Sequence, residues 1–322
     1  MKNYGTKFFM LIMAISIFSC QEKNPLDIDV SQIDTHVNFI RFDQDFYGNS
    51  PDKLPEIKQK YPYLFPPRTP DSIWIDKMQD SLLLELKKQV DSVFPDMNKY
   101  KEPVNDLYKH IKYYFPSFKS PDIITLYSDW NYMRRAAYLD SLQFLTPDNF
   151  LGVNNKLYKG IPMYIRRNLI PERIPVEIAK SYAEAVVAPP KAKNFISKMI
   201  NAGKKLYLLD AFLPQTPDSL KIGYPTNKLK WAEDNEEKVW EYFIEKKLLF
   251  KDGNNLDMRF LNTAPYSKFY SEEDQQTPGR IGQYMGWQIV RSYMQKNKVS
   301  LQKLLQTPEE EIFKKSKYKP KK

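Results

Sequence analysis

Two adjacent arginines beside a tyrosine form the most suggestive binding group in the sequence. The segment Gly160-Ile161-Pro162-Met163-Tyr164-Ile165-Arg166-Arg167 places two guanidinium groups close to a phenol. Guanidinium groups bind carboxylate or phosphate oxygens through paired, charge-assisted hydrogen bonds. Tyr164, Arg166 and Arg167 are therefore candidate contacts for a ligand or a partner protein. Ion pairing within the fold is the alternative interpretation.

Few residues of the sequence are candidates for general acid–base catalysis or for metal binding. The chain has 2 His and 1 Cys among 322 residues, and it has no phosphate-binding glycine loop, no serine elbow and no CxxC. Two histidines exclude a three-histidine metal site, and one cysteine excludes a disulfide framework. We interpret His36 and His110 as structural or solvated residues. The acid pairs at 233–234 and 236–237 are interpreted as a charged helix face.

The single cysteine lies in a pattern typical of lipid attachment. Lys2 and Lys7 precede an uncharged run over 8–18. That run is shorter than the roughly 20 residues that span a bilayer, and it is typical of a signal peptide. It ends in Ile17-Phe18-Ser19-Cys20, which resembles a bacterial lipobox with an unusually large residue at position 18. The sequence therefore predicts a signal peptide over 1–19 and a covalent lipid on Cys20. An ordinary signal peptide with an incidental cysteine is the alternative.

The remaining organisation follows from composition. Residues 20–36 are polar and acidic, which predicts a lipidated flexible tether. A single globular domain is expected over 37–313, and a basic tail over 314–322. We interpret the tail as a solvated terminus, with contact to an acidic surface or lipid head groups as the alternative. Gln21, rather than Asp, follows the cysteine and resembles the general signal for the outer membrane, with the domain facing the periplasm.

Net charge alone does not indicate a nucleic-acid partner. The formal charge is +10, from 49 Lys and Arg against 39 Asp and Glu. Most of the basic residues are lysines, whereas base and phosphate readers depend strongly on arginine. We therefore expect no nucleic-acid partner for an envelope lipoprotein.

Hydrophobic spacing predicts a mostly helical α+β fold with a small sheet near the N-terminal half. The dipeptide Thr-Pro predicts helix starts at 70, 217, 278 and 308, because proline is well suited to the first helical turn. Gly282 and Gly286 lie four residues apart, which permits close approach of another backbone. The expected helices are 75–94, 104–115, 176–187, 193–212, 232–250 and 280–296, and the expected strands are 37–46, 122–130 and 142–151.

Several runs closely resemble the gliding motility lipoprotein GldB family of Bacteroidota. The resemblance covers nearly the whole chain. It implies a membrane-anchored lipoprotein required for gliding and associated with the type IX secretion machinery, with no catalytic role assigned. The runs that carry it are Phe150-Leu151-Gly152, 163–167, 203–207, 221–224, Trp240-Glu241-Tyr242-Phe243, 279–290 and the closing 313–321.

A weaker resemblance points to putative zinc-dependent proteases of the zincin type. Their helix carries H-E-x-x-H, with two zinc ligands and a general base on one face. The corresponding run here is Val176-Glu177-Ile178-Ala179-Lys180, which keeps the glutamate but replaces both ligands. An aliphatic side chain cannot bind zinc and a lysine cation repels it. The resemblance therefore implies a degenerate zincin-like scaffold, a pseudoenzyme with no metal and no cofactor.

Three functions remain open. The first is a non-catalytic assembly or stabilising component of the gliding and secretion machinery, anchored by acyl chains such as palmitate. The second is a lipoprotein that binds a glycan or peptide through its tyrosines and tryptophans. The third is a hydrolase that uses Glu177 as general base.

Overall fold

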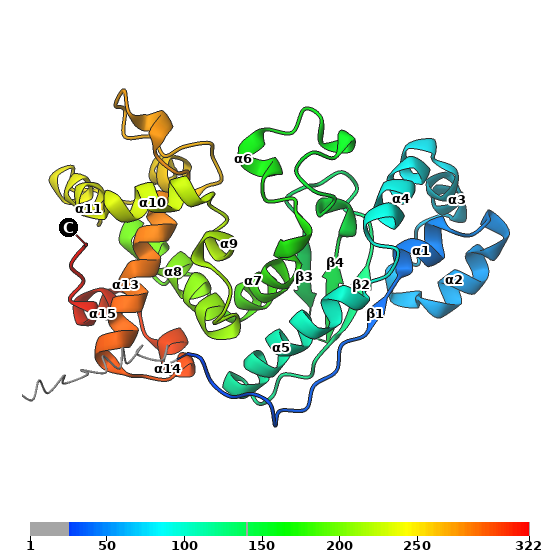
Figure 1. The fold of residues 1–322 in the computed structure, drawn as a ribbon, viewed down its shortest axis with the longest axis horizontal. Coiled ribbons are helices and arrows are strands. Elements are labelled where there is room, and N and C mark those ends of the chain that lie inside the picture. The colour runs from blue at the N-terminus through cyan, green and yellow to red at the C-terminus, as the bar shows by residue number, and fades with distance from the viewer. Residues whose placement is uncertain (1–25, 140, 322) are drawn as a thin grey trace, which may run out of the picture.

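The computed structural model describes residues 26–139 and 141–321, which form a mostly helical α+β fold with one small sheet (Figure 1). The predicted fold class is confirmed to that extent, whereas its zincin-like character stays a prediction. The signal peptide and Cys20 lie outside the described residues. Within the described part, no helix is both long enough and apolar enough to cross a bilayer.

The sheet has four short strands: β1 (Phe39–Ile40), β2 (Asp122–Thr125), β3 (Ala136–Leu139) and β4 (Leu142–Leu145). Their order is β1-β2-β4-β3. β1 pairs with β2 and β2 with β4 in parallel, whereas β3 pairs with β4 antiparallel. The three predicted strands are present but shorter, since residues 42–47 form a helix. The edge strand β3 was not predicted, and its residues are only half-buried or exposed.

The N-terminal helices are α1 (Phe42–Tyr47), α2 (Leu54–Lys60), α3 (Asp71–Gln79), α4 (Ser81–Val93) and α5 (Asn98–Tyr114). The single helix expected over 75–94 is wrong, because the chain breaks at Asp80. Asp80 is extended, and its Oδ1 accepts hydrogen bonds from the N–H groups of Leu82 and Leu83. This side chain caps α4 and so begins a new helix.

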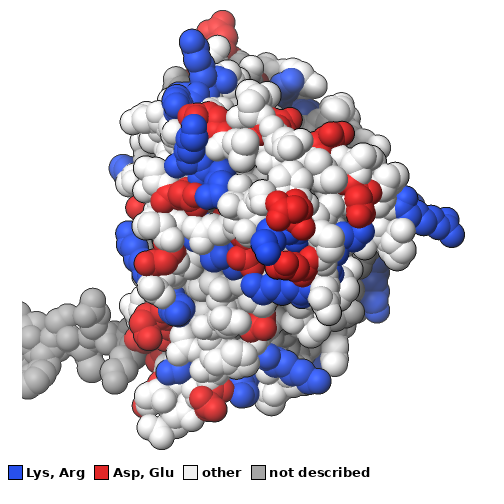
Figure 2. All heavy atoms as spheres, turned by 90° about the vertical axis from the view of Figure 1, so that its right-hand side faces the viewer, with Lys and Arg blue, Asp and Glu red and all other residues white. Residues whose placement is uncertain are grey.

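The face formed by these N-terminal helices mixes both signs of charge (Figure 2). Lys58 pairs with Asp71 at 2.6 Å, and Lys77 pairs with Asp129 at 3.0 Å. Such exposed pairs contribute little to stability, about 0–1 kcal/mol each. Basic side chains therefore do not accumulate into a single-sign patch on this face.

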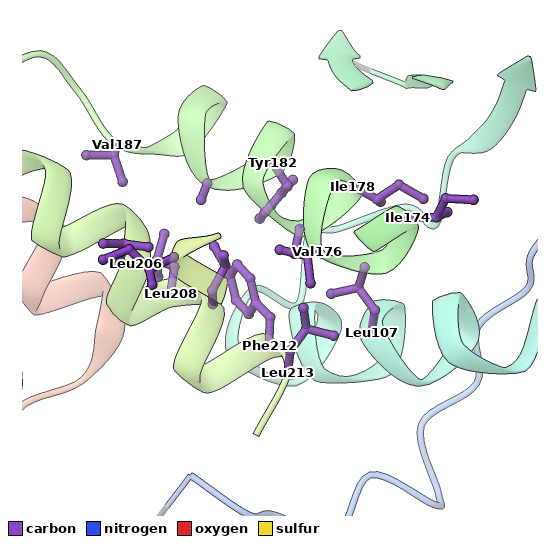
Figure 3. Close-up of a cluster of buried hydrophobic side chains, with 14 of the residues drawn as sticks. Leu107, Ile174, Val176, Ile178, Tyr182, Val187, Leu206, Leu208, Phe212 and Leu213 are labelled. Atoms are coloured by element: carbon purple, nitrogen blue, oxygen red, sulfur yellow. The ribbon is translucent and has the colours of Figure 1, made fainter. Parts of the chain in front are cut away.

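The central core lies between α5, α7 (Ile174–Val186) and α8 (Phe195–Phe212). Figure 3 shows Leu107 of α5, Val176 of α7 and Phe212 of α8 converging on it. All three side chains are at most 1% exposed. α7 also packs on β3, so the helix that carries Glu177 is fixed on two sides.

The C-terminal half contains α9 (Asp218–Ile222), α10 (Thr226–Asp234), α11 (Glu236–Glu245), α12 (Asn254–Leu256), a π-helix over Asp257–Leu261, α13 (Ile281–Asn297), α14 (Leu301–Gln306) and α15 (Glu309–Ser316). The helix expected over 232–250 is wrong, because it divides at Asn235.

α8 and α13 form an extensively packed helix pair. A Cβ on Gly286 would lie 1.8 Å from the carbonyl oxygen of Met199, so α13 needs glycine there. The close approach predicted for Gly286 is confirmed.

Three of the four predicted helix starts are confirmed. Pro70, Pro217 and Pro308 lie directly before α3, α9 and α15. The prediction at 278 is wrong by three residues, because Gly279 and Arg280 intervene before α13. Arg280 has a left-handed backbone with φ 62°, so it redirects the chain into that helix.

Residues 26–36 pack on the domain, which corrects the flexible tether expected there. Val30 is buried, and the hydroxyl of Thr35 donates to Oδ1 of Asn105 at 2.8 Å. Nζ of Lys112 donates to the carbonyl of Asp34 at 2.7 Å. This N-terminal segment follows the lower edge of the molecule in Figure 1.

The C-terminal tail also packs on the domain, which corrects the solvated terminus expected over 314–322. The ring of Tyr318 meets Trp240 edge-on at 5.2 Å. Its hydroxyl donates to Oε1 of Glu236 at 2.6 Å, and the N–H of Lys321 donates to the same oxygen. Glu236 and Glu237 lie in the first turn of α11, as expected for a charged helix face, but Glu236 is only 2% exposed and binds the tail.

Candidate functional site

A cationic cleft lies between the two halves of the described chain. On one side stands α6 (Met163–Arg166), and across from it lie α9, α10 and the segment 263–280 (Figure 1). The N-terminal half of α7 forms its floor. The cavity is small, with a volume of about 70 Å³. Its charged lining consists of one carboxylate, Glu177, and six cations: Arg135, Arg167, Arg173, Lys180, Lys228 and Arg280.

Glu177 is held by two arginines. Its Oε1 accepts hydrogen bonds from Nη1 of Arg135 at 2.9 Å and from Nη2 of Arg173 at 2.7 Å. Burial by itself would raise the pKa of Glu177, but Arg173, Lys180 and Arg135 outweigh burial and hold that pKa well below its usual range. The carboxylate therefore stays ionised and neutralises part of the arginine cluster.

Arg280 lines the cleft without a carboxylate partner of its own. Among the described residues, its guanidinium donates to the carbonyl of Ile222 at 2.8 Å and lies over the ring of Tyr224. Burial lowers the pKa of Arg280, and the charges of Arg173 and Arg135 lower it further. An arginine side chain nevertheless keeps its proton in proteins. Its positive charge is therefore left partly uncompensated.

A glycine brings the backbone close to this cluster. Gly223 ends α9 with a left-handed φ of 74°. A Cβ there would lie 2.9 Å from Oδ1 of Asn168 and 3.0 Å from Nη1 of Arg173. Glycine therefore satisfies both the turn and the narrow wall of the cleft.

The predicted contact residues separate into two groups. Tyr164 and Arg167 line the cleft, whereas Arg166 does not. Neither arginine forms an ion pair with any carboxylate in the part of the chain that the structure describes. Arg167 donates from Nε to the carbonyl of Met163, and burial lowers its pKa. The alternative of internal ion pairing is wrong for these two residues within that part.

Lys228 faces Arg167 across the cleft. Its Nζ donates to the carbonyl oxygens of Gln275 and Gln276 at 2.8 Å and of Thr277 at 3.1 Å. Burial and the charge of Arg167 lower the pKa of Lys228. Two cations thus approach each other with no carboxylate between them among the lining residues.

The positions aligned with a zinc-binding motif have different roles. Val176 belongs to the hydrophobic core in Figure 3, where it is 1% exposed. Lys180 lies at the edge of the cleft, 4.0 Å from Oε2 of Glu177 and 3.9 Å from Glu184. Residues 26–139 and 141–321 contain no group of three His, Cys, Asp or Glu side chains placed to hold a metal. The zincin resemblance stays a prediction.

A second charged cluster differs from the cleft in that its charges balance. Arg291 donates to both Asp210 and Asp218, and Lys221 pairs with Asp210 at 3.0 Å. Two cations therefore meet two carboxylates. This contrast identifies the excess of cations in the cleft as a local feature and not a general property of the fold.

Sequence reasoning missed four of the cleft cations: Arg135, Arg173, Lys228 and Arg280. They come from separate segments, so their meeting depends on the tertiary fold. One signal was available, since Arg173 and Glu177 lie four residues apart and therefore on one helix face. Arg280 also lies within the run 279–290 that carries the family resemblance.

The fold and cleft define a mostly helical α+β protein with a pocket lined mainly by cations and a carboxylate held by arginines. The chain belongs to the family described as gliding motility protein GldB, whose model matches residues 23–320. This membership implies a gliding motility lipoprotein. No curated protein and no solved structure matches the chain.

Proposed function

We propose that this protein is a non-catalytic, lipid-anchored component of the gliding machinery that works by holding other envelope proteins. The observation that carries the proposal is the family match over residues 23–320, which includes the cleft. The proposed anchor is an acyl-modified Cys20 at the outer membrane, with the domain facing the periplasm. The proposed partners are other gliding and type IX secretion proteins. Neither nucleic acid nor a metal is part of the proposal.

The state of Glu177 supports a non-catalytic role. A general base works best when its pKa lies near the operating pH. The pKa of Glu177 lies well below the usual carboxyl range, and its Oε1 is occupied by two arginines. An ion-pair role explains this geometry better than a hydrolase mechanism.

A complementation experiment tests the proposal. A strain lacking the gene should fail to spread on a surface, and the wild-type gene should restore spreading. Cys20→Ser should restore neither spreading nor membrane association, because the anchor is removed. Normal spreading of the deletion strain would overturn the proposal.

The same assay separates the hydrolase alternative. Glu177→Gln should restore spreading in proportion to the amount of folded protein that accumulates. If this variant accumulates at wild-type level with an unchanged melting temperature but does not restore spreading, Glu177 has a chemical role. That result would favour the hydrolase.

Ligand binding through exposed aromatic side chains has less support. Trp287 and Trp240 are buried, at 0% and 8% exposure, and Trp231 is half-buried. Trp130, at 49%, is the well exposed member of these four tryptophans. The cationic cleft is the better supported place for a ligand.

A further inference from the structure

We propose that the cationic cleft binds the phosphate group of a phosphate monoester carried by a polar molecule such as a sugar. The proposal concerns a ligand and is independent of the gliding role. It rests on the unpaired cations of the cleft, on the small size of its cavity and on a neighbouring cavity that shares part of its lining.

The positive charge of the cleft exceeds what a single negatively charged group would balance. Arg135 and Arg173 share Glu177, the single carboxylate in the lining. Arg167, Arg280 and Lys228 form no ion pair with a carboxylate among residues 26–139 and 141–321. Clustered like charges destabilise a fold. Ionisable groups whose pKa values are shifted by close neighbours are frequent at functional sites. A phosphate monoester carries about −1.5 to −2 charges at pH 7, whereas a carboxylate carries one.

The available donors suit phosphate oxygens. Arginine presents a planar set of N–H groups that binds phosphate through paired hydrogen bonds. Arg167 and Arg280 reach the cleft from opposite sides, one after α6 and one before α13. Tyr164 and Asn168, which also carry polar groups, line the cavity as well. A cavity of about 70 Å³ has room for a phosphate group.

The remainder of the ligand has room next to this cavity. A second cavity of about 440 Å³ shares Arg173, Lys180, Thr263 and Arg280 with the first. Its lining mixes apolar and polar side chains, and the polar ones include Asn201, Asn262 and Gln283. These side chains can hydrogen-bond hydroxyl groups. The two cavities together fit a phosphate head followed by a hydroxyl-rich body.

The chain offers a matched pair of variants for the test. Arg167 lines the cleft, and its neighbour Arg166 does not, although both have no carboxylate partner among the described residues. Arg167→Gln and Arg166→Gln remove the same charge from adjacent positions. Arg280→Gln provides a second cleft variant from the other wall. Thermal melting of each protein checks that it is folded.

The experiment is calorimetric titration of the full lipidated protein in a non-ionic detergent. The probes are inorganic phosphate, glucose 6-phosphate, glucose and acetate. Glucose 6-phosphate should bind more tightly than inorganic phosphate, and glucose and acetate should bind weakly or not at all. Arg167→Gln and Arg280→Gln should each weaken glucose 6-phosphate binding by about tenfold or more, since a charge-assisted hydrogen bond is lost. Arg166→Gln should leave binding unchanged.

Three results would overturn the proposal. The first is the absence of phosphate and glucose 6-phosphate binding by the folded wild-type protein. The second is equal binding of acetate, which would show a general carboxylate or anion site. The third is an equal loss of binding in Arg166→Gln and Arg167→Gln, which would place the anion outside the cleft. Each of these results leaves the gliding role untouched, because spreading is measured separately.

Discussion

Arg173 and Glu177 lie one helical turn apart and form a buried ion pair, with Nη2 2.7 Å from Oε1. Their side chains are only 4% and 6% exposed. Nε of Arg173 donates to the same oxygen at 3.1 Å, so two N–H groups on one edge of the guanidinium meet a single carboxylate oxygen. The pair lies at the start of α7 and lines the cleft. Arg135, which directly precedes β3, adds a further hydrogen bond to Glu177.

Glu177→Gln should destabilise the fold, because it leaves Arg135 and Arg173 buried without a counter-charge. Removing one partner of a buried ion pair costs about 3–5 kcal/mol. The lowered pKa of Glu177 means that its contribution is present above the ordinary value of 4.5 and is lost as the pH falls. Urea unfolding at pH 7 and at lower pH should therefore show a difference from wild type that shrinks with acid. Glu184→Gln, on an exposed part of the same helix, should change stability by less than about 1 kcal/mol. Equal effects of the two variants would contradict this.

Asp148→Asn should stabilise the protein at neutral and alkaline pH. Asp148 is 5% exposed, and its carboxylate accepts hydrogen bonds from the N–H and the hydroxyl of Ser128. Burial raises its pKa from 3.8 to about 7. The folded state therefore binds more protons than the unfolded state between these values, and stability falls as the pH rises through that window. Each pKa unit corresponds to about 1.4 kcal/mol, so the variant should gain up to several kcal/mol at pH 8.

The pH dependence is the decisive readout for Asp148. Unfolding free energies from pH 4 to pH 8 should fall less steeply in Asp148→Asn than in the wild type. Asp234→Asn, which removes an exposed carboxylate paired with Lys230, serves as the control and should retain the wild-type slope. An unchanged slope in Asp148→Asn would show that the buried carboxyl titrates normally.

Gly286→Ala should prevent α13 from packing against α8. The added Cβ would lie 1.8 Å from the carbonyl oxygen of Met199, and a backbone atom cannot move aside cheaply. We expect a loss of about 3 kcal/mol or more, or no soluble protein. Gly160→Ala is the comparison, since that glycine has open space but a φ of 95°. It should cost only about 1–2 kcal/mol from backbone strain. Similar melting temperatures for the two variants would argue against a tight helix crossing.

Tyr318→Phe should loosen the C-terminal tail. The lost hydroxyl leaves Glu236 with hydrogen bonds from Tyr284 and from the N–H of Lys321. A hydrogen bond to a charged group contributes about 1.5–3 kcal/mol, and we expect a loss in that range. Limited proteolysis should then remove the tail faster than in wild type. Tyr270→Phe alters a ring that is 73% exposed and should have no effect on either measurement. Unchanged proteolysis of Tyr318→Phe would mean that the hydroxyl of Tyr318 does not hold the tail.

Local sequence signals predicted most of the long helices but not their interruptions. The helix over 193–212 follows from apolar spacing, and α8 occupies almost the same range. Asp80 and Asn235 break two other predicted helices, because a single polar residue can cap a new helix or end an old one without disturbing the apolar period. The strand β3 was missed because its alternating residues face partly to solvent, so it depends on pairing with β4.

The site was harder to predict for a physical reason. Tyr164 and Arg167 were identifiable because they are neighbours in the chain, and both line the cleft. Arg280 belongs to the same pocket but is more than 100 residues away in sequence. Arg280 and Arg173 lie in one pocket because α8 and α13 cross and because the chain turns at Gly223. No spacing within a single segment carries that information.

The packed N-terminal segment fixes how the molecule would stand on a membrane. Leu26 lies six positions after Cys20 and lines a groove with Tyr113 and Gln302. An extended chain covers about 3.3–3.6 Å per residue, so a lipid on Cys20 would keep this groove within about 20 Å of the bilayer. α14 lies at that end of the molecule, whereas α6 lies at the opposite end (Figure 1). With a lipid on Cys20, the end of the molecule that carries α14 would therefore lie nearer the bilayer than the end that carries α6.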